Sequence, residues 1–150
     1  MTRVTDLPAD LQARIGGADL VVFDGVCVLC SGFFRFMLRQ DRHGRFRFAT
    51  AQSEIGQALY AALDLPREDF ETNLVIVEER IHQRLDAFAA AMRALGGLVG
   101  PLSWLALLPV GVKDGAYHAI ARNRYRLFGR RATCLLPEAA LRGRFLPGGW

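Results

Sequence analysis

Two kinds of apolar pattern organise the first two thirds of this chain. Residues 20–23 and 74–77 are short, unbroken apolar runs, which are typical of strands buried on both faces. Phe46 and Phe48 alternate with Arg45 and Arg47, which predicts another strand. A tight connection at residues 78–79 leads to a further strand at residues 80–83. The chain therefore predicts four strands.

Apolar side chains between these strands recur instead with a helical period. This spacing predicts helices over residues 27–40, 53–63 and 87–95, and Asp86 is the expected cap of the last one. An N-terminal arm, residues 1–18, has a shorter helical pattern that ends at two glycines. From residue 19 onward the order is β-α-β-α-β-β-α. A buried first strand, a helix after it, and a late hairpin followed by a helix together describe an α/β, thioredoxin-like three-layer core.

Residues 96–150 are expected to form a helical extension on that core, so that a single domain spans residues 1–150 with its core at residues 19–95. The stretch 96–111 has no charged residue but contains four glycines and two prolines, a poor composition for a helix that crosses lipid. We expect a short helix from Pro101, then a turn, and a longer helix over residues 113–128.

An alternative use of this uncharged stretch is contact with other molecules. Residues 98–110, from Leu98 to Val110, are apolar enough to touch a membrane surface or a membrane protein. In this alternative, the protein is a non-catalytic interaction module.

Composition narrows the functional classes. The 150 residues are 51% hydrophobic and 23% charged, as in an ordinary globular domain. The net charge of +4 comes almost wholly from arginine, and few aromatic residues accompany the arginines, so solvated helix faces are expected and no nucleic-acid partner. Three cysteines and an N-terminus without an apolar signal-type segment favour a cytoplasmic protein.

The candidate chemistry lies where the first strand meets its helix. Cys27 and Cys30 form a C-x-x-C pair there, and the unpaired N–H groups of a helix start favour a thiolate. Cys27, expected nearer to solvent, would be the nucleophile, and Cys30, expected deeper, the resolving thiol. Val28 and Leu29 add no charge between them, so we expect a moderately lowered pKa for Cys27. No cofactor is expected.

Other interpretations of this segment stay open. Asp24 either caps the loop that it forms with Gly25 or accepts a proton from Cys30 during resolution. Cys134 is a buried thiol, a relay thiol or a third metal ligand. A zinc-stabilised domain is the weaker alternative, because the histidines are scattered singly and a fourth ligand must be assumed. We therefore predict no metal site.

The motif Asp24-Gly25-x-Cys27-x-x-Cys30 after an apolar strand resembles the signature of the DCC family of thiol–disulfide oxidoreductases, named for its Asp-Cys-Cys pattern. The stretch Tyr117-His-Ala-Ile-Ala-Arg-Asn-Arg-Tyr-Arg resembles the C-terminal block of that family. The resemblance implies a thioredoxin-like fold, a redox-active cysteine pair, and a protein or low-molecular-weight thiol or disulfide as the substrate.

The chain departs from thioredoxins proper in one respect. They place a cis-proline just before the third strand, where this chain has Thr72 and Asn73. These two residues, with Gly25, Val28 and Leu29, are the expected substrate-binding residues. Arg122 and Arg124 are expected to be structural groups at a helix end; the alternative is that they hold an anionic partner.

Overall fold

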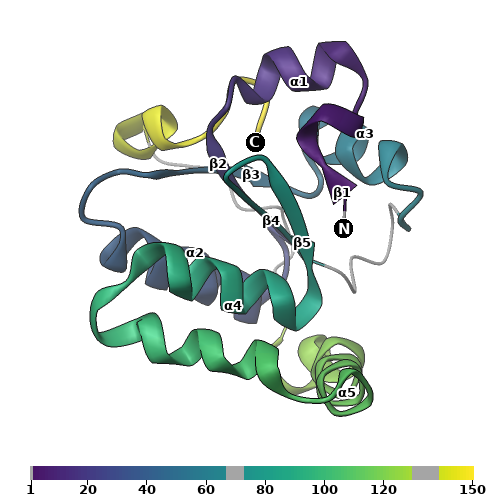
Figure 1. Ribbon diagram of the computed structural model, residues 1–150. Coiled ribbons are helices and arrows are strands. Elements are labelled where there is room, and N and C mark those ends of the chain that lie inside the picture. The colour runs from purple at the N-terminus through teal and green to yellow at the C-terminus, as the bar shows by residue number, and fades with distance from the viewer. Residues whose placement is uncertain (1, 67–72, 130–138) are drawn as a thin grey trace.

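The computed structural model describes residues 2–66, 73–129 and 139–150, and a five-stranded mixed sheet lies at its centre (Figure 1). The strand order is β1-β5-β4-β2-β3. β3 runs parallel to β2, whereas β4 is antiparallel to both β2 and β5. The strands are β1 (Thr2–Arg3), β2 (Asp19–Phe23), β3 (Phe46–Thr50), β4 (Leu74–Val77) and β5 (Arg80–Gln83). The order and directions of β2 to β5 confirm the predicted thioredoxin-like core.

Helices cover both faces of the sheet. α1 and α3 lie on one face, α2 and α4 lie on the other, and α5 lies outside α2 and α4 (Figure 1). The α-helices are α1 (Ala9–Ile15), α2 (Val28–Gln40), α3 (Glu54–Ala62), α4 (Arg84–Leu95) and α5 (Val110–Phe128). The 3₁₀ segments are η1 (Val4–Asp6), η2 (Gly97–Leu107) and η3 (Ala139–Arg144).

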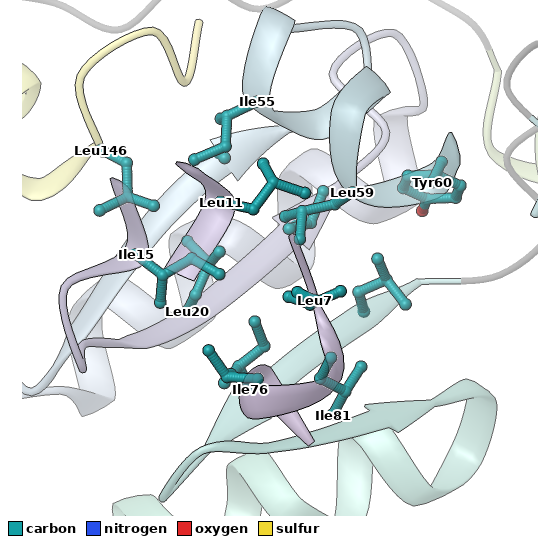
Figure 2. Packing of buried hydrophobic residues seen from close by; sticks show 14 of the residues in the cluster. Leu7, Leu11, Ile15, Leu20, Ile55, Leu59, Tyr60, Ile76, Ile81 and Leu146 are labelled. Carbon is teal, nitrogen blue, oxygen red and sulfur yellow. The ribbon is translucent and has the colours of Figure 1, made fainter. Parts of the chain in front are cut away.

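Alternation along β2 divides the core into two clusters. Leu20 and Val22 face α1 and α3, whereas Val21 and Phe23 face α2 and α4, because successive side chains of a strand point to opposite faces. Figure 2 shows the first cluster, in which Leu11 of α1 lies beside Leu59 of α3 and Ile15 lies beside Leu20 of β2. Both faces of β2 are therefore buried, as its unbroken apolar run predicts.

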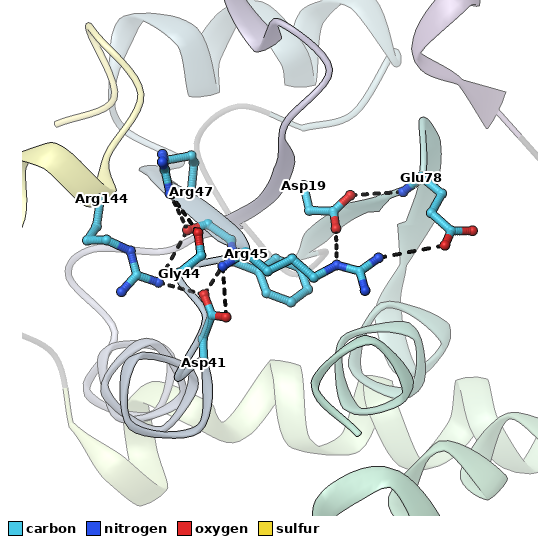
Figure 3. Close-up of polar contacts among 8 residues, drawn as sticks. Asp19, Asp41, Gly44, Arg45, Arg47, Glu78 and Arg144 are labelled. Carbon is cyan, nitrogen blue, oxygen red and sulfur yellow. Dashed lines mark hydrogen bonds and ion pairs between the residues drawn. The ribbon is translucent and has the colours of Figure 1, made fainter. Parts of the chain in front are cut away.

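The last residue of η3, Arg144, is tied to the same sheet. The carboxylate of Asp41 accepts from the Phe46 N–H at 2.8 Å and from the Arg144 guanidinium at 2.6 Å (Figure 3). Arg45 bonds to the Asp19 carboxylate, which also accepts from the Glu78 N–H at 2.9 Å. These ion pairs join the end of α2, the start of β2 and the β4–β5 turn. They lie at the end of the sheet where β2 begins, opposite the end from which β2 leads to the cysteine pair.

Three expected helix starts are wrong in detail. α4 begins at Arg84, so Asp86 is not its cap; Asp86 lies in the first turn and accepts from Lys113 of α5 at 2.8 Å. Pro101 lies inside η2 instead of starting a helix, and α5 begins at Val110, three residues earlier than expected. Proline fixes its own φ and tolerates the first turn or a tight turn, so its position alone does not locate a start.

η2 leaves much of its apolar surface uncovered. Leu98 is 100% exposed, Leu107 is 82% exposed, and Trp104 is also largely exposed. Of the helices that the structure describes, none combines the length and the apolar character that a membrane crossing needs.

Candidate functional site

Cys27 and Cys30 lie at the start of α2, directly after the buried strand β2. The Cys27 N–H donates to the Asp24 carbonyl oxygen at 3.3 Å and closes a turn between strand and helix. Cys27 is the N-cap of α2, and its sulfur accepts from the Cys30 N–H at 3.4 Å. A sulfur therefore occupies the place where a hydroxyl or carboxylate usually caps a helix.

The pKa values of the two thiols are shifted in opposite directions. A hydrogen bond from the Cys30 thiol is the main cause that lowers the pKa of Cys27 to about 6, and the Cys30 N–H adds to it against the opposing effect of burial. The same thiol hydrogen bond, together with burial, raises the pKa of Cys30. Both shifts favour a negative charge on Cys27 and a proton on Cys30.

The expected order of exposure is wrong. Cys27 has 0% of its surface exposed, whereas Cys30 is partly exposed. The expectation followed from the position of Cys27 at the helix end, but that end is covered: the Val28 N–H donates to the carbonyl oxygen of Gly129, just after α5, at 3.4 Å. A helix far along the chain thus closes over the N-terminus of α2, which periodicity within the first helix does not reveal.

Asp24 is buried and accepts hydrogen bonds from several directions. Only 3% of the residue is exposed. Its carboxylate accepts from the Val26 N–H at 3.0 Å, as a loop-capping aspartate does. The Gln52 side chain donates to it at 2.5 Å and also accepts from the Gly25 N–H at 2.9 Å. The capping interpretation of Asp24 is therefore observed in the structure.

Arg124 supplies the counter-charge of Asp24. Its guanidinium lies 3.4 Å from the Asp24 carboxylate, and only 3% of the residue is exposed. The neighbouring Tyr125 hydroxyl donates to the same carboxylate. Burial and this hydrogen bond raise the pKa of Tyr125 to about 12, so it stays a protonated donor. Arg124 is therefore not a group at a helix end, as expected from the sequence, but half of a buried ion pair; Arg122 is exposed.

An apolar pocket of about 470 Å³ opens beside Cys30. Leu29 and Asn73, two of the expected substrate-binding residues, line it together with Asp24. Asn73 is held by Tyr117 of α5, whose hydroxyl accepts from the Asn73 N–H at 3.1 Å and donates to its side-chain oxygen at 2.8 Å.

The remaining expected residues are placed differently. Val28 is exposed at the start of α2 and does not line this pocket. Gly25 contacts Gln52 through its N–H. Thr72 and Cys134 lie outside the described residues. No cis peptide bond occurs in the parts of the chain that are described.

Sequence reasoning did not find Gln52, Tyr125 and Tyr117 as members of this site. Tyr117 and Tyr125 belong to the C-terminal motif, so the presence of two motifs in one chain was a signal that they meet. Gln52 follows β3 with no motif around it, and only the parallel pairing of β2 and β3 brings it to Asp24.

The described residues show no arrangement for a metal. Within residues 2–66, 73–129 and 139–150, no group of three His, Cys, Asp or Glu residues could hold a metal ion.

Comparison with known proteins agrees with this geometry. The protein YuxK of Bacillus subtilis (strain 168), described as uncharacterized, is 35% identical over 131 residues, which cover 85% of this chain and 93% of that protein. A chloroplastic DCC family protein of Arabidopsis thaliana is 31% identical over 118 residues, covering 78% of this chain and 69% of that protein. No solved structure matches the chain.

The DCC1-like thiol-disulfide oxidoreductase family matches residues 21–130, which include the cysteine pair, Asp24, and the Arg124–Tyr125 segment that meets it. This chain therefore belongs to the DCC1-like thiol-disulfide oxidoreductase family.

Proposed function

We propose that this protein exchanges thiols and disulfides, with Cys27 as the attacking thiolate and Cys30 as the resolving thiol. The observation that carries the proposal is the position of the Cys27 sulfur at the N-cap of α2, where it accepts from the Cys30 N–H at 3.4 Å. With its pKa at about 6, Cys27 is mostly a thiolate at neutral pH. Cys30 keeps its proton until its turn to react.

The proposed reaction has two steps. The Cys27 thiolate attacks one sulfur of a substrate disulfide, the substrate S–S bond breaks, and one substrate thiolate leaves. Cys30 then loses its proton and attacks the Cys27 sulfur of the mixed disulfide, which releases the second substrate thiolate and forms a Cys27–Cys30 disulfide. The substrate gains two electrons from the cysteine pair, one proton from Cys30 and one proton from solvent, and the same steps in reverse oxidise a dithiol.

Asp24 is proposed to act on this pair through its charge and its position. Its carboxylate raises the pKa of Cys27 while Arg124 lowers it, so the two charges act on the sulfur in opposite directions. Four donors already occupy the Asp24 carboxylate. This favours a positioning role over the alternative, in which Asp24 takes the Cys30 proton.

The family supports a protein or a small thiol compound as the substrate. A reducing compartment, such as the cytoplasm, fits a chain whose three cysteines are too few for a disulfide scaffold.

The test is to trap each mixed disulfide. Cys30→Ser should accumulate a stable adduct on Cys27 when the protein is mixed with a small disulfide, because the resolving thiol is missing. Cys27→Ser should react at least about tenfold more slowly, because the remaining thiol is protonated at neutral pH. Peptide mass mapping identifies the modified cysteine.

Three results would contradict the proposal in different ways. An adduct on Cys30 in the Cys27→Ser protein that forms as fast as the wild-type reaction would reverse the two roles. The absence of a reversible Cys27–Cys30 disulfide in the wild-type protein would end the redox function. One zinc ion per purified chain would favour the metal-stabilised alternative.

A second candidate function rests on the exposed surface of η2. Leu98, Trp104 and Leu107 of this segment are largely exposed, and apolar side chains of this kind bind at membrane surfaces. We propose peripheral membrane contact through residues 98–110. The wild-type protein should bind to lipid vesicles, and changing Trp104 and Leu107 to serine should abolish this binding. Equal sedimentation of both proteins with vesicles would contradict it.

A further inference from the structure

The pocket beside Cys30 indicates which substrates reach the cysteine pair, and this inference rests on the proposed exchange function. We propose that this pocket binds the apolar group of an uncharged, low-molecular-weight disulfide and presents its S–S bond to the Cys27–Cys30 pair. A volume of about 470 Å³ lies within the range of sites for small molecules.

The walls of the pocket favour an apolar ligand. Phe33 of α2 and Phe88 of α4 line it with their rings 5.9 Å apart. Ile120 and Leu127 of α5 line it too, and both side chains are largely exposed. Leucine and isoleucine at the edge of a concave site lose exposed surface when an apolar group enters. Aromatic walls with an aliphatic edge therefore suit a ring or an alkyl group.

The charges in the lining do not suit an anionic thiol. Arg124 and Asp24 are the two charged residues of the lining, and they pair with each other at 3.4 Å. A carboxylate on the ligand would enter beside Asp24 and would have to share the guanidinium that offsets it. The cost of removing that carboxylate from water would be poorly compensated. Uncharged compounds avoid this cost.

The path to the reactive sulfur also favours this pocket. Cys27 has no exposed surface, but its sulfur accepts from the Cys30 N–H at 3.4 Å, and Cys30 borders the pocket. A disulfide in the pocket lies against Cys30 and is one side chain away from the Cys27 thiolate. A rotation of the Cys30 side chain then brings substrate and thiolate together, after which the two exchange steps proceed as above.

The test uses two aromatic disulfides that differ in charge. The reduced protein is mixed with 4,4′-dipyridyl disulfide, which is uncharged, or with 5,5′-dithiobis(2-nitrobenzoate), which carries two carboxylates. Each rate is divided by the rate of a simple free thiol at the same pH, which removes the intrinsic reactivity of the compound. We expect this normalised rate to be about tenfold higher for the uncharged disulfide, the effect of burying one ring.

Pocket variants and a matched control test whether the preference for the uncharged disulfide arises in this pocket. Replacing both Ile120 and Leu127 with glutamine adds no charge and keeps good helix formers at exposed positions; it should lower the preference at least about threefold. Val112→Gln makes the same change at an exposed site on α5 outside the pocket and should leave the preference as it is. A preference that is absent, or that survives the double change, would overturn the proposal.

A second measurement separates the pocket from the exchange function. Diphenyl sulfide has two uncharged rings and no S–S bond, so it reports on binding alone. It should shift the methyl NMR signals of Ile120 and Leu127 and leave those of Val112 unmoved. Methyl shifts with diphenyl sulfide, but no Cys27–Cys30 disulfide when 4,4′-dipyridyl disulfide is added, would contradict the exchange function, whereas exchange without charge preference or methyl shifts would contradict the pocket.

Discussion

At the scale of single residues, a few neighbours set the pKa of Cys27. The Cys27 sulfur accepts a hydrogen bond from the Cys30 N–H at 3.4 Å, and hydrogen bonding to Cys30 is the main cause that lowers its pKa. Arg124 lowers the pKa of Cys27 and Asp24 raises it, and each charge contributes less than the hydrogen bonds from Cys30. The nearest donors therefore decide the acidity of Cys27, and they belong to the motif itself.

The pH dependence of the Cys27 thiolate follows from these donors. Because the pKa is lowered to about 6, the thiolate should form between about pH 5 and 7, with its midpoint well below the usual value of about 8.5. Cys30→Ala removes the thiol donor and should move the midpoint toward the usual value. The measurement is the thiolate absorbance at 240 nm as a function of pH.

Cys30→Ser is the matched control, since its hydroxyl can still donate a hydrogen bond. Its midpoint should stay below that of Cys30→Ala. If both variants titrate at the same pH as the wild type, the thiol of Cys30 does not stabilise the thiolate.

The buried pair Asp24–Arg124 makes a separate prediction about stability. Arg124→Met would leave a carboxylate with only 3% of its residue exposed and no counter-charge. The free energy of unfolding should fall by about 3–5 kcal/mol, as measured by urea denaturation. Combining Asp24→Asn with Arg124→Met should recover part of the lost free energy of unfolding, because no unpaired carboxylate is then buried.

Arg122→Met is the control for this prediction. Arg122 is two residues away on the same helix and is exposed, so its loss should change the free energy of unfolding by less than about 0.5 kcal/mol. Equal losses from the two arginines would show that the ion pair with Asp24 contributes nothing specific.

At the scale of elements, the close approach of α3 to the end of β3 holds the loop that carries Gln52. The Ser53 hydroxyl caps α3 by accepting from the Gly56 N–H at 3.1 Å. A methyl group added at Gly56 would collide with the Thr50 carbonyl oxygen and lie 2.8 Å from that of Ala51. Only a glycine lets the helix start this near the strand that precedes it.

Gly56→Ala should therefore lower the free energy of unfolding by about 1–3 kcal/mol, as overpacking of a tight contact does. Gly32→Ala is the matched change in α2, where nothing lies within 4 Å of the added carbon. It should raise stability by about 0.5–1 kcal/mol, because alanine is the better helix former. Thermal or urea unfolding measures both, and a Gly56→Ala protein as stable as Gly32→Ala would contradict the contact.

At the scale of the whole molecule, much of the fold was predictable because it depends on local patterns. The unbroken run of β2 and the helical period of α2 each follow from neighbouring residues. The ion pair of Asp24 with Arg124 joins residues that are 100 positions apart, and the covered end of α2 depends on Gly129. Local periodicity carries no information on either contact. Cys27 is buried for the same reason, since a distant helix covers it.

The C-terminal segment shows this long-range closure most clearly. The Leu146 N–H donates to the Phe48 carbonyl oxygen at 3.0 Å, and the Thr50 N–H donates to that of Gly149 at 2.8 Å. Two neighbouring residues of this segment face opposite sides of the sheet. Phe145 packs in the cluster with α2 and α4. Leu146 packs in the cluster with α1 and α3 (Figure 2). One short segment thus completes the core on both faces of the sheet.

Truncating either side chain should therefore destabilise the whole domain. Phe145→Ala removes a ring that packs against Phe23, Phe34 and Phe48 and should cost about 3–5 kcal/mol. Leu146→Ala should cost about 2–5 kcal/mol on the other face. Leu107→Ala, a change at a side chain that is 82% exposed, should stay within about 0.5 kcal/mol of the wild type. Urea unfolding distinguishes them, and a loss below about 1 kcal/mol for Phe145→Ala would mean that the sheet keeps its core without this segment.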